Sequence, residues 1–205
     1  MTGYAARVEQ IAPGIWHWSG KHPRIKIVVH SYYLSGERVL IDPIAPTDGL
    51  AWFEEHGPPR DVLLTNRHHY RSSSLFDERF GVTVHCVRAG LHEFGEGQKI
   101  EPFDVGDELP GGVVAHVVGA ICPDETALHI PALQALALAD GAVRWEPGGP
   151  LAFVPDKFMD NPKETKIGLR EAYRRVARLD FRHLLLAHGE PVLETGRATL
   201  AGFAR

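Results

Sequence analysis

Residues 63 to 71 read Leu63-Leu64-Thr65-Asn66-Arg67-His68-His69-Tyr70-Arg71. The first three residues continue an apolar run from Asp61 and predict a short buried strand. The strand runs directly into polar, imidazole and cationic side chains. Its end therefore carries groups that can bind a metal ion, the histidines, next to guanidinium groups that cannot.

The composition predicts a single globular domain over residues 1–205. The 205 residues are 44% hydrophobic, which is enough for a substantial core. The formal charge of -4, from 22 basic and 26 acidic residues, provides no basic stripe for nucleic acid and no polybasic patch for a membrane surface. A small-molecule substrate or ligand is the expected partner, and nothing in the sequence addresses the oligomeric state.

The ends and the cysteines favour a cytoplasmic location. The N-terminus has neither a charged nor an apolar leader region, and no apolar run is long enough to span a membrane. Only Cys86 and Cys122 are present, too few for a disulfide framework, and a reducing compartment would keep both as thiols.

The order of predicted elements favours two sheets packed between helices. In the first half, strands are expected at residues 15–18, 25–34, 38–41, 61–65 and 82–86, with helices after Thr47 and at residues 76–80 and 89–94. In the second half, strands are expected at residues 112–118, 126–130, 135–139 and 181–187. Asn161 and Pro162 predict the start of a helix that continues to about residue 178, and Thr195 is expected to cap a last helix.

Four segments, in chain order, resemble the metallo-β-lactamase superfamily. They are the strand ending at Asp42, the stretch from 63 to 71, the strand ending at Asp140-Gly141, and Leu184 to Pro191 with His188. The resemblance covers most of the chain. It implies an α/β fold, a four-layer αββα sandwich, in which these strand ends form the site.

The resemblance also implies which residues form the site. Typical members hold two metal ions that activate a water for attack on a carbonyl or phosphoryl centre. His68, Asp140 and His188 match ligand positions, and Asp42 matches an aspartate beneath the metals. Asn66, Tyr70 and Arg71 stand at other ligand positions.

One further ligand histidine of the superfamily is missing from the matching segment, residues 118–125. Its position is taken by Ala120 or Ile121. Cys122 is close enough in sequence to substitute as a soft ligand, but a small buried hydrophobic role is the plainer interpretation.

Arg71 bears most directly on mechanism, because a guanidinium cannot coordinate a cation. It either projects into the vacated position and pairs with Asp140, or points out of the cleft as an exposed arginine. We therefore expect the second metal site to be lost.

At most one zinc or iron ion is expected, held by His68, Asp140 and His188, and the absence of any metal is an equal alternative. His69 would contribute only if the backbone turns, because alternation along an extended stretch points it away from His68. Asn66 offers a weak neutral oxygen. The residues expected to line the cleft between the strand ends are Asp42, Asn66, His69 and Cys122.

Three functions remain open from the sequence. The first is a hydrolase of unknown substrate that uses one metal ion. The second is a metal-free protein that binds a small molecule or partner without hydrolase activity. The third is a metal-free enzyme that uses Tyr70, His68 and Asp140 in acid–base chemistry, with Arg71 beside them.

Overall fold

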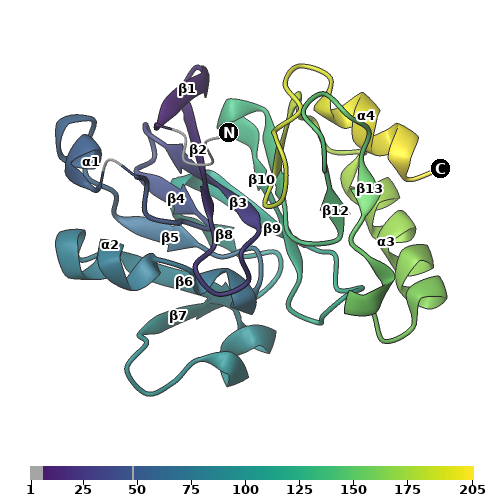
Figure 1. Cartoon of the computed structure of the whole chain (residues 1–205), viewed down its shortest axis with the longest axis horizontal. Coiled ribbons are helices and arrows are strands. Elements are labelled where there is room, and N and C mark those ends of the chain that lie inside the picture. The colour runs from purple at the N-terminus through teal and green to yellow at the C-terminus, as the bar shows by residue number, and fades with distance from the viewer. Residues whose placement is uncertain (1–6, 48) are drawn as a thin grey trace.

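The first sheet contains seven strands in the order β1-β2-β3-β4-β5-β6-β7 (Figure 1). The structure is a computed structural model that describes residues 7–47 and 49–205. The seven strands are Glu9–Ala12, Ile15–Lys21, Val28–Leu34, Val39–Ile41, Asp61–Leu63, Thr83–Val87 and Ile100–Phe103. Strands β1 to β4 pair antiparallel, and β4 to β7 pair parallel.

The second sheet contains five strands in the order β14-β11-β10-β9-β8. They are His183–Leu186, Ala135–Leu138, Thr126–Ile130, Val113–Val117 and Glu108–Leu109. Only β11 and β14 pair parallel. A separate hairpin joins β12, Ala142–Val143, to β13, Ala152–Phe153.

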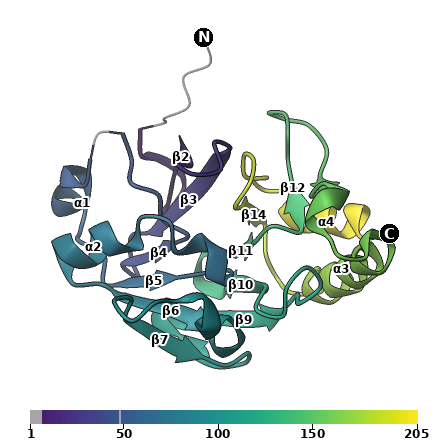
Figure 2. The same ribbon diagram turned by 60° about the horizontal axis from the view of Figure 1, so that its bottom comes forward.

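Within residues 7–47 and 49–205, four α-helices cover the outer faces of the two sheets. Figures 1 and 2 show α1 (Ala51–Glu55) and α2 (Ser73–Phe80) beside the first sheet, and α3 (Pro162–Val176) and α4 (Gly196–Phe203) beside the second. The predicted four-layer αββα sandwich is confirmed. Within the described residues, no helix combines the length and the apolar character that a membrane crossing requires.

Alternate residues of the central strands enter different cores, which is why the layers form. Tyr33, Leu40 and Val62 pack against Phe53 of α1 and Phe76 of α2. Their chain neighbours face the other way, because side chains alternate along a strand. These neighbours pack between the two sheets, against Leu128, Ala137 and Leu185 of the second sheet; they are Tyr32, Leu34, Ile41 and Leu63.

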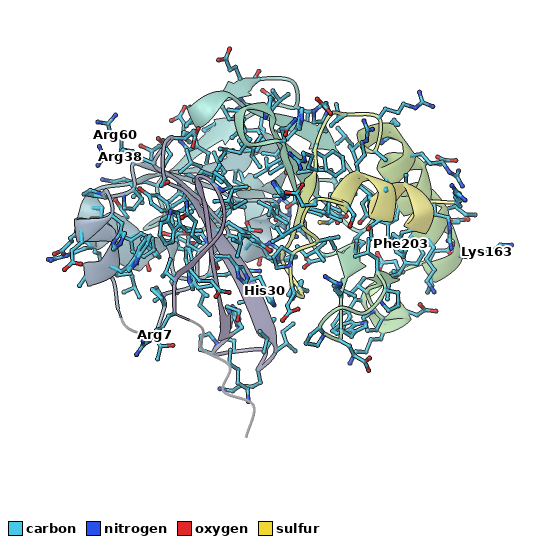
Figure 3. The ribbon with its side chains drawn as sticks, turned by 90° about the horizontal axis from the view of Figure 1, so that it is seen from above. Arg7, His30, Arg38, Arg60, Lys163 and Phe203 are labelled. Atoms are coloured by element: carbon cyan, nitrogen blue, oxygen red, sulfur yellow. The ribbon has the colours of Figure 1, made fainter. Side chains whose placement is uncertain are left out.

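The third core lies beneath the C-terminal helices. Leu136 and Leu184 of the second sheet contact the cluster that includes Leu169 and Tyr173 of α3 and Leu200 of α4. In Figure 3, His30 lies where the N-terminal and C-terminal halves meet, whereas Lys163 and Phe203 lie on the helical side of the second half.

Helix starts were predicted with mixed success. The Asn161 side chain accepts a hydrogen bond from the backbone N–H of Glu164, and Pro162 begins α3 as expected. Thr195 stands at the predicted N-cap position of α4, although its side chain makes no capping hydrogen bond. The expected helix at residues 89–94 is a 3-10 turn, Arg88–Glu93.

The predicted strand over residues 25–34 begins only at Val28. Residues 22 to 27 form a tight turn, closed by the backbone bonds from His22 N to Ile27 O (2.8 Å) and from Lys26 N to His22 O (3.0 Å). Lys26 adopts a φ of 61°, which a strand excludes. The turn carries its apolar side chains, Ile25 and Ile27, over the edge of the site described next.

Candidate active site

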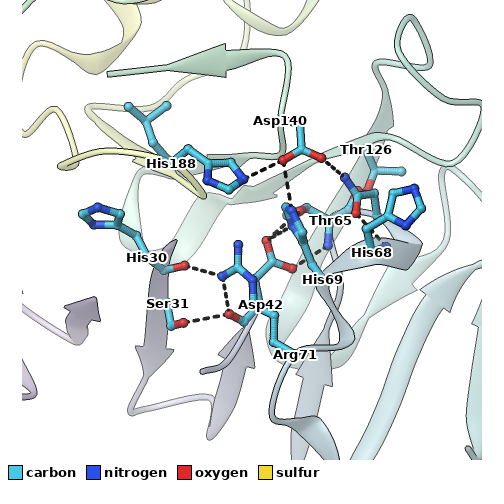
Figure 4. A network of polar contacts seen from close by, with 12 residues as sticks. His30, Ser31, Asp42, Thr65, His68, His69, Arg71, Thr126, Asp140 and His188 are labelled. Carbon is cyan, nitrogen blue, oxygen red and sulfur yellow. Dashed lines mark hydrogen bonds and ion pairs between the residues drawn. The ribbon is translucent and has the colours of Figure 1, made fainter. Parts of the chain in front are cut away.

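The candidate site lies where the carboxyl ends of four strands meet. Asp42 directly follows β4, the stretch from 63 to 71 continues from β5, Asp140 follows β11, and His188 follows β14. Because β4 pairs parallel with β5, and β11 with β14, the carboxyl ends of the two strands in each pair lie at the same edge of their sheet. Figure 4 shows the resulting network of polar contacts.

The chain turns directly after β5. Asn66 is extended, with φ -157° and ψ 170°, and its side-chain oxygen accepts the backbone N–H of His68 at 2.9 Å. The next residues, Arg67–Tyr70, form a 3-10 turn. The backbone therefore turns here, which was the condition for a contribution from His69: His69 is buried, with 4% of its surface exposed, and His68 is an exposed residue.

His69, Asp140 and His188 form the central cluster. His69 Nε2 lies 3.1 Å from Asp140 Oδ1, and His188 Nε2 lies 2.7 Å from the same oxygen. Their potential ligand atoms all lie within 4.8 Å of one another. Asn66 Nδ2 donates to the other carboxylate oxygen, Asp140 Oδ2, at 2.8 Å. The expected trio contained His68, and the structure brings His69 to that place.

Asp42 anchors the cluster from below. Its Oδ1 accepts the backbone N–H of Thr65 at 2.9 Å, and its Oδ2 accepts the Thr65 hydroxyl at 2.6 Å and His69 Nδ1 at 2.8 Å. Asp42 is 2% exposed. It lies beneath the cluster, as the resemblance implied, and does not line the cleft.

The two carboxylates hold His69 in its charged form. Burial disfavours a charged imidazole, but the negative charges of Asp42 and Asp140 outweigh burial and raise the pKa of His69 to about 9. Burial would likewise raise the pKa of Asp140, but His69 and His188 hold that pKa well below its usual range. At neutral pH an imidazolium therefore lies between two carboxylates.

Arg71 occupies neither of its predicted positions. Its Nη1 donates to the backbone carbonyls of His30 and Asp42, each at 2.7 Å, and Asp140 pairs instead with the two histidines. The residue is half-buried beside the cluster and does not point away. Its backbone has φ 43° and ψ -109°, so the turn itself directs the side chain inward. The prediction of an ion pair with Asp140 was wrong, because the guanidinium is held by the carbonyl of His30 in β3 and by that of Asp42 after β4.

Two other candidates lie apart from the cluster. Tyr70 is half-buried and packs its ring 5.9 Å from that of Phe94. Cys122 is buried beside Asp124 and Arg67, and burial raises the pKa of its thiol, so a thiolate ligand is disfavoured.

Comparison with known proteins identifies the fold. No family model matches the chain, and no curated protein matches its sequence. A metallo-β-lactamase from Pontibacter korlensis superposes with a TM-score of 0.71 at 14% identity, covering 97% of this chain and 98% of that one. The chain has the metallo-β-lactamase fold.

Two further structures of this fold are similar. A metallo-β-lactamase family protein from Thermus thermophilus has a TM-score of 0.66 at 17% identity, covering 95% of this chain and 79% of that one. The metal-soaked flavodiiron core of Flv1 from Synechocystis has a TM-score of 0.67 at 13% identity, covering 96% and 59%. At these identities the metallo-β-lactamase fold is shared, and the chemistry must be read from the side chains.

The donor set of the cluster fits one metal ion. Two imidazoles and one carboxylate are ligands that suit zinc or iron, and three protein ligands leave a position open. Asp42 accepts the Nδ1–H of His69, the contact that usually orients a ligand histidine and leaves Nε2 free to coordinate. His188 Nδ1 is buried and has no hydrogen-bond partner among the described residues.

The cluster opens on a cleft with two lobes. The apolar lobe, of about 420 Å³, contains Asp140, His69 and His188, and its walls are Ile25, Ile27, Val29, Ile121, Val154 and Phe158. The polar lobe, of about 540 Å³, is lined among others by Arg24, Arg67, Tyr70, Glu93 and Gln98. His22, Ile25, His68 and Arg71 line both lobes. Sequence reasoning missed the lining from His22 to Ile27 and from Val154 to Phe158, because nothing local marks these loops as facing a site.

Proposed function

We propose that the chain is a hydrolase that uses one metal ion, held by His69, Asp140 and His188. The observation that carries the proposal is the convergence of three ligand atoms within 4.8 Å at the floor of a cleft. One zinc or iron ion there would supply Lewis-acid chemistry toward a carbonyl or phosphoryl oxygen.

A second ion is disfavoured by the neighbouring side chains. The Asn66 amide is already committed, because it donates to Asp140 and accepts from the backbone of His68. The Arg71 guanidinium adds a permanent positive charge beside the cluster, which would repel a second cation. The proposed centre is therefore mononuclear.

The surrounding residues prepare the three ligands. Asp42 fixes the ring and tautomer of His69 through Nδ1, so that loss of the Nε2 proton exposes a lone pair directed at the cluster. Asn66 holds Oδ2 of Asp140 and leaves Oδ1 facing the two histidines. The apolar walls would exclude bulk water from a bound substrate and strengthen electrostatic interactions at the cluster.

A metal-free ligand-binding protein is the second candidate, and charge balance favours it. With His69 protonated, the charges of Asp42 and Asp140 are matched by those of His69 and Arg71. Both oxygens of Asp140 accept hydrogen bonds in the same arrangement. The site is therefore electrostatically satisfied with no ion, as a binding cleft requires.

Elemental analysis of protein purified without an affinity tag or added metal separates the two candidates. The hydrolase proposal predicts about one equivalent of zinc or iron in the wild type, and none in His69→Ala. His68→Ala is the matched control, because His68 is the adjacent, exposed imidazole and should retain the metal. A wild type free of metal, or a His69→Ala variant that keeps it, would favour the metal-free protein.

A further inference from the structure

Arg71 stands at the boundary between the two lobes of the cleft. Together with His22, Ile25 and His68 it lines both lobes, and it lies two residues after His69 of the cluster. A group bound against Arg71 would therefore also lie beside the cluster.

The guanidinium of Arg71 has spare hydrogen-bonding capacity. Nη1 is fixed by two backbone carbonyls, but Nη2 is buried and has no hydrogen-bond partner among the described residues. Figure 4 shows this nitrogen pointing towards the His188 and His69 rings. A buried donor without a partner is costly, and an arriving anion would satisfy it with a charge-assisted hydrogen bond. Because Nη2 is covered, binding requires a small shift of the side chains around it.

The apolar lobe lies immediately next to this charge. Ile25, Ile27 and Phe158 on its rim are 58%, 41% and 59% exposed. Large apolar side chains gathered at one opening are typical of a binding site for an apolar group. Ile121 and Val154 continue the apolar wall inward.

Charge at the opening also favours an anion. The chain has a net charge of -4, yet Lys157 and His22 line the apolar lobe and Arg24 lines the polar lobe. Among the described residues that line the apolar lobe, Asp140 is the only carboxylate, and it is paired with two histidines.

We infer that the cleft binds a medium-chain acyl group, with the carboxylate of the free acid at Arg71 and the hydrocarbon chain in the apolar lobe. Resting on the proposed function, this assigns the substrate as an acyl ester or thioester. Water adds its hydroxyl to the acyl carbon, the bond from that carbon to oxygen or sulfur breaks, and the leaving atom takes a proton. The products are the acid, which loses a proton to become the bound carboxylate, and an alcohol or thiol.

Calorimetric titration with octanoate, octanamide and butyrate tests this inference, in protein as purified and again in the presence of a chelator. The affinity for octanoate should be at least about tenfold higher than that for octanamide, because only the acid carries the charge that Arg71 recognises. The affinity for octanoate should also be at least about tenfold higher than that for butyrate, because the longer chain buries more methylene groups. Arg71→Gln should reduce octanoate affinity to that of octanamide, whereas Arg197→Gln, an exposed site on α4, should not.

Ile121→Ser provides a second test that leaves the guanidinium in place. It should weaken octanoate binding and leave butyrate binding unchanged. Equal affinities of the wild type for octanoate and octanamide, or for octanoate and butyrate, would overturn the inference. Octanoate binding by protein that is purified without metal would support the acyl site while removing the metal-dependent hydrolase, so the two proposals can fail separately.

Discussion

Nδ1 of His69 lies 2.8 Å from Oδ2 of Asp42, and both side chains are buried. The other ring nitrogen of His69 faces Asp140 at 3.1 Å, so the imidazole is fixed from both sides. A turn of 3-10 helix places the ring there, and the aspartate at the end of β4 orients it. This contact therefore connects the fold to the site.

Replacing Asp42 by asparagine should destabilise the protein and weaken the cluster. The carboxylate of Asp42 accepts hydrogen bonds from Thr65 and His69 through its two oxygens. An asparagine amide has only one oxygen that accepts, and its NH2 group donates. We expect a loss of about 2 to 4 kcal/mol in the free energy of unfolding, and zinc affinity lower by about 10- to 100-fold. Denaturant unfolding and zinc competition against a chromophoric chelator measure these effects.

Asp61→Asn is the matched control for this prediction. Asp61 Oδ1 lies 2.8 Å from His85 Nε2, but the pair is on neighbouring strands away from the cluster and the Asp61 side chain is 21% exposed. Its replacement should cost less than about 1 kcal/mol and leave zinc affinity unchanged. Equal losses in the two variants would show that Asp42 has no special role.

Arg71 should be replaced more easily by glycine than by alanine. Both variants lose the two bonds to the carbonyls of His30 and Asp42. Only glycine adopts φ 43° and ψ -109° without strain, so Arg71→Gly should be about 1 kcal/mol more stable than Arg71→Ala. Urea denaturation of both variants provides the comparison.

Arg174, exposed on α3, provides the opposite case. Within a helix glycine is less favourable than alanine, so Arg174→Gly should be about 1 kcal/mol less stable than Arg174→Ala. If the alanine variant were more stable than the glycine variant at both positions, the backbone at Arg71 would be unstrained.

The sequence predicted the frame of the site better than its centre. Asp42, Asp140 and His188 each follow an apolar strand, and strand ends are marked by local pattern. The exchange of His68 for His69 depends on the side chain of Asn66, which accepts from the backbone of His68 and starts a turn. It also depends on Asp42, which is distant in sequence, so local alternation could not reveal it.

Strand β7, Ile100–Phe103, was missed for a related reason. Pro102 argues against a central strand, but β7 pairs only with β6 and lies at the sheet's edge, where a missing N–H is tolerated. The two-residue strands β12 and β13 are too short to carry any periodic pattern.

A buried histidine pair should make stability depend on pH. His17 Nε2 lies 2.8 Å from His30 Nδ1, and burial lowers the pKa of His17 to about 4 and that of His30 to about 3. In the unfolded chain both histidines have a pKa of about 6.5. Below this pH they bind protons that the buried histidines of the folded chain do not bind. Stability contributed by the pair is therefore lost as the pH falls from about 6.5 towards 4.

His17→Gln should reduce that loss, because one of the two groups no longer titrates. We expect the free energy of unfolding to fall less steeply, by about 1 kcal/mol per pH unit between pH 6 and pH 5. His92→Gln, at an exposed position in the turn Arg88–Glu93, should leave the slope of the wild type unchanged. An unchanged slope in His17→Gln would contradict the assignment.

Gly141 should tolerate no side chain, because it allows α3 to pack against the loop that presents Asp140. A Cβ at this position would collide with the Tyr173 hydroxyl, and it would lie 2.5 Å from Leu169 Cδ2 and 2.9 Å from Glu125 Oε1. Gly141→Ala should therefore lower the free energy of unfolding by about 1 to 3 kcal/mol. Gly202→Ala on α4 meets no atom within 4 Å and should be neutral or stabilising by up to about 1 kcal/mol. Thermal unfolding of the two alanine variants compares them directly, and similar melting temperatures would mean that α3 can move without disturbing the site.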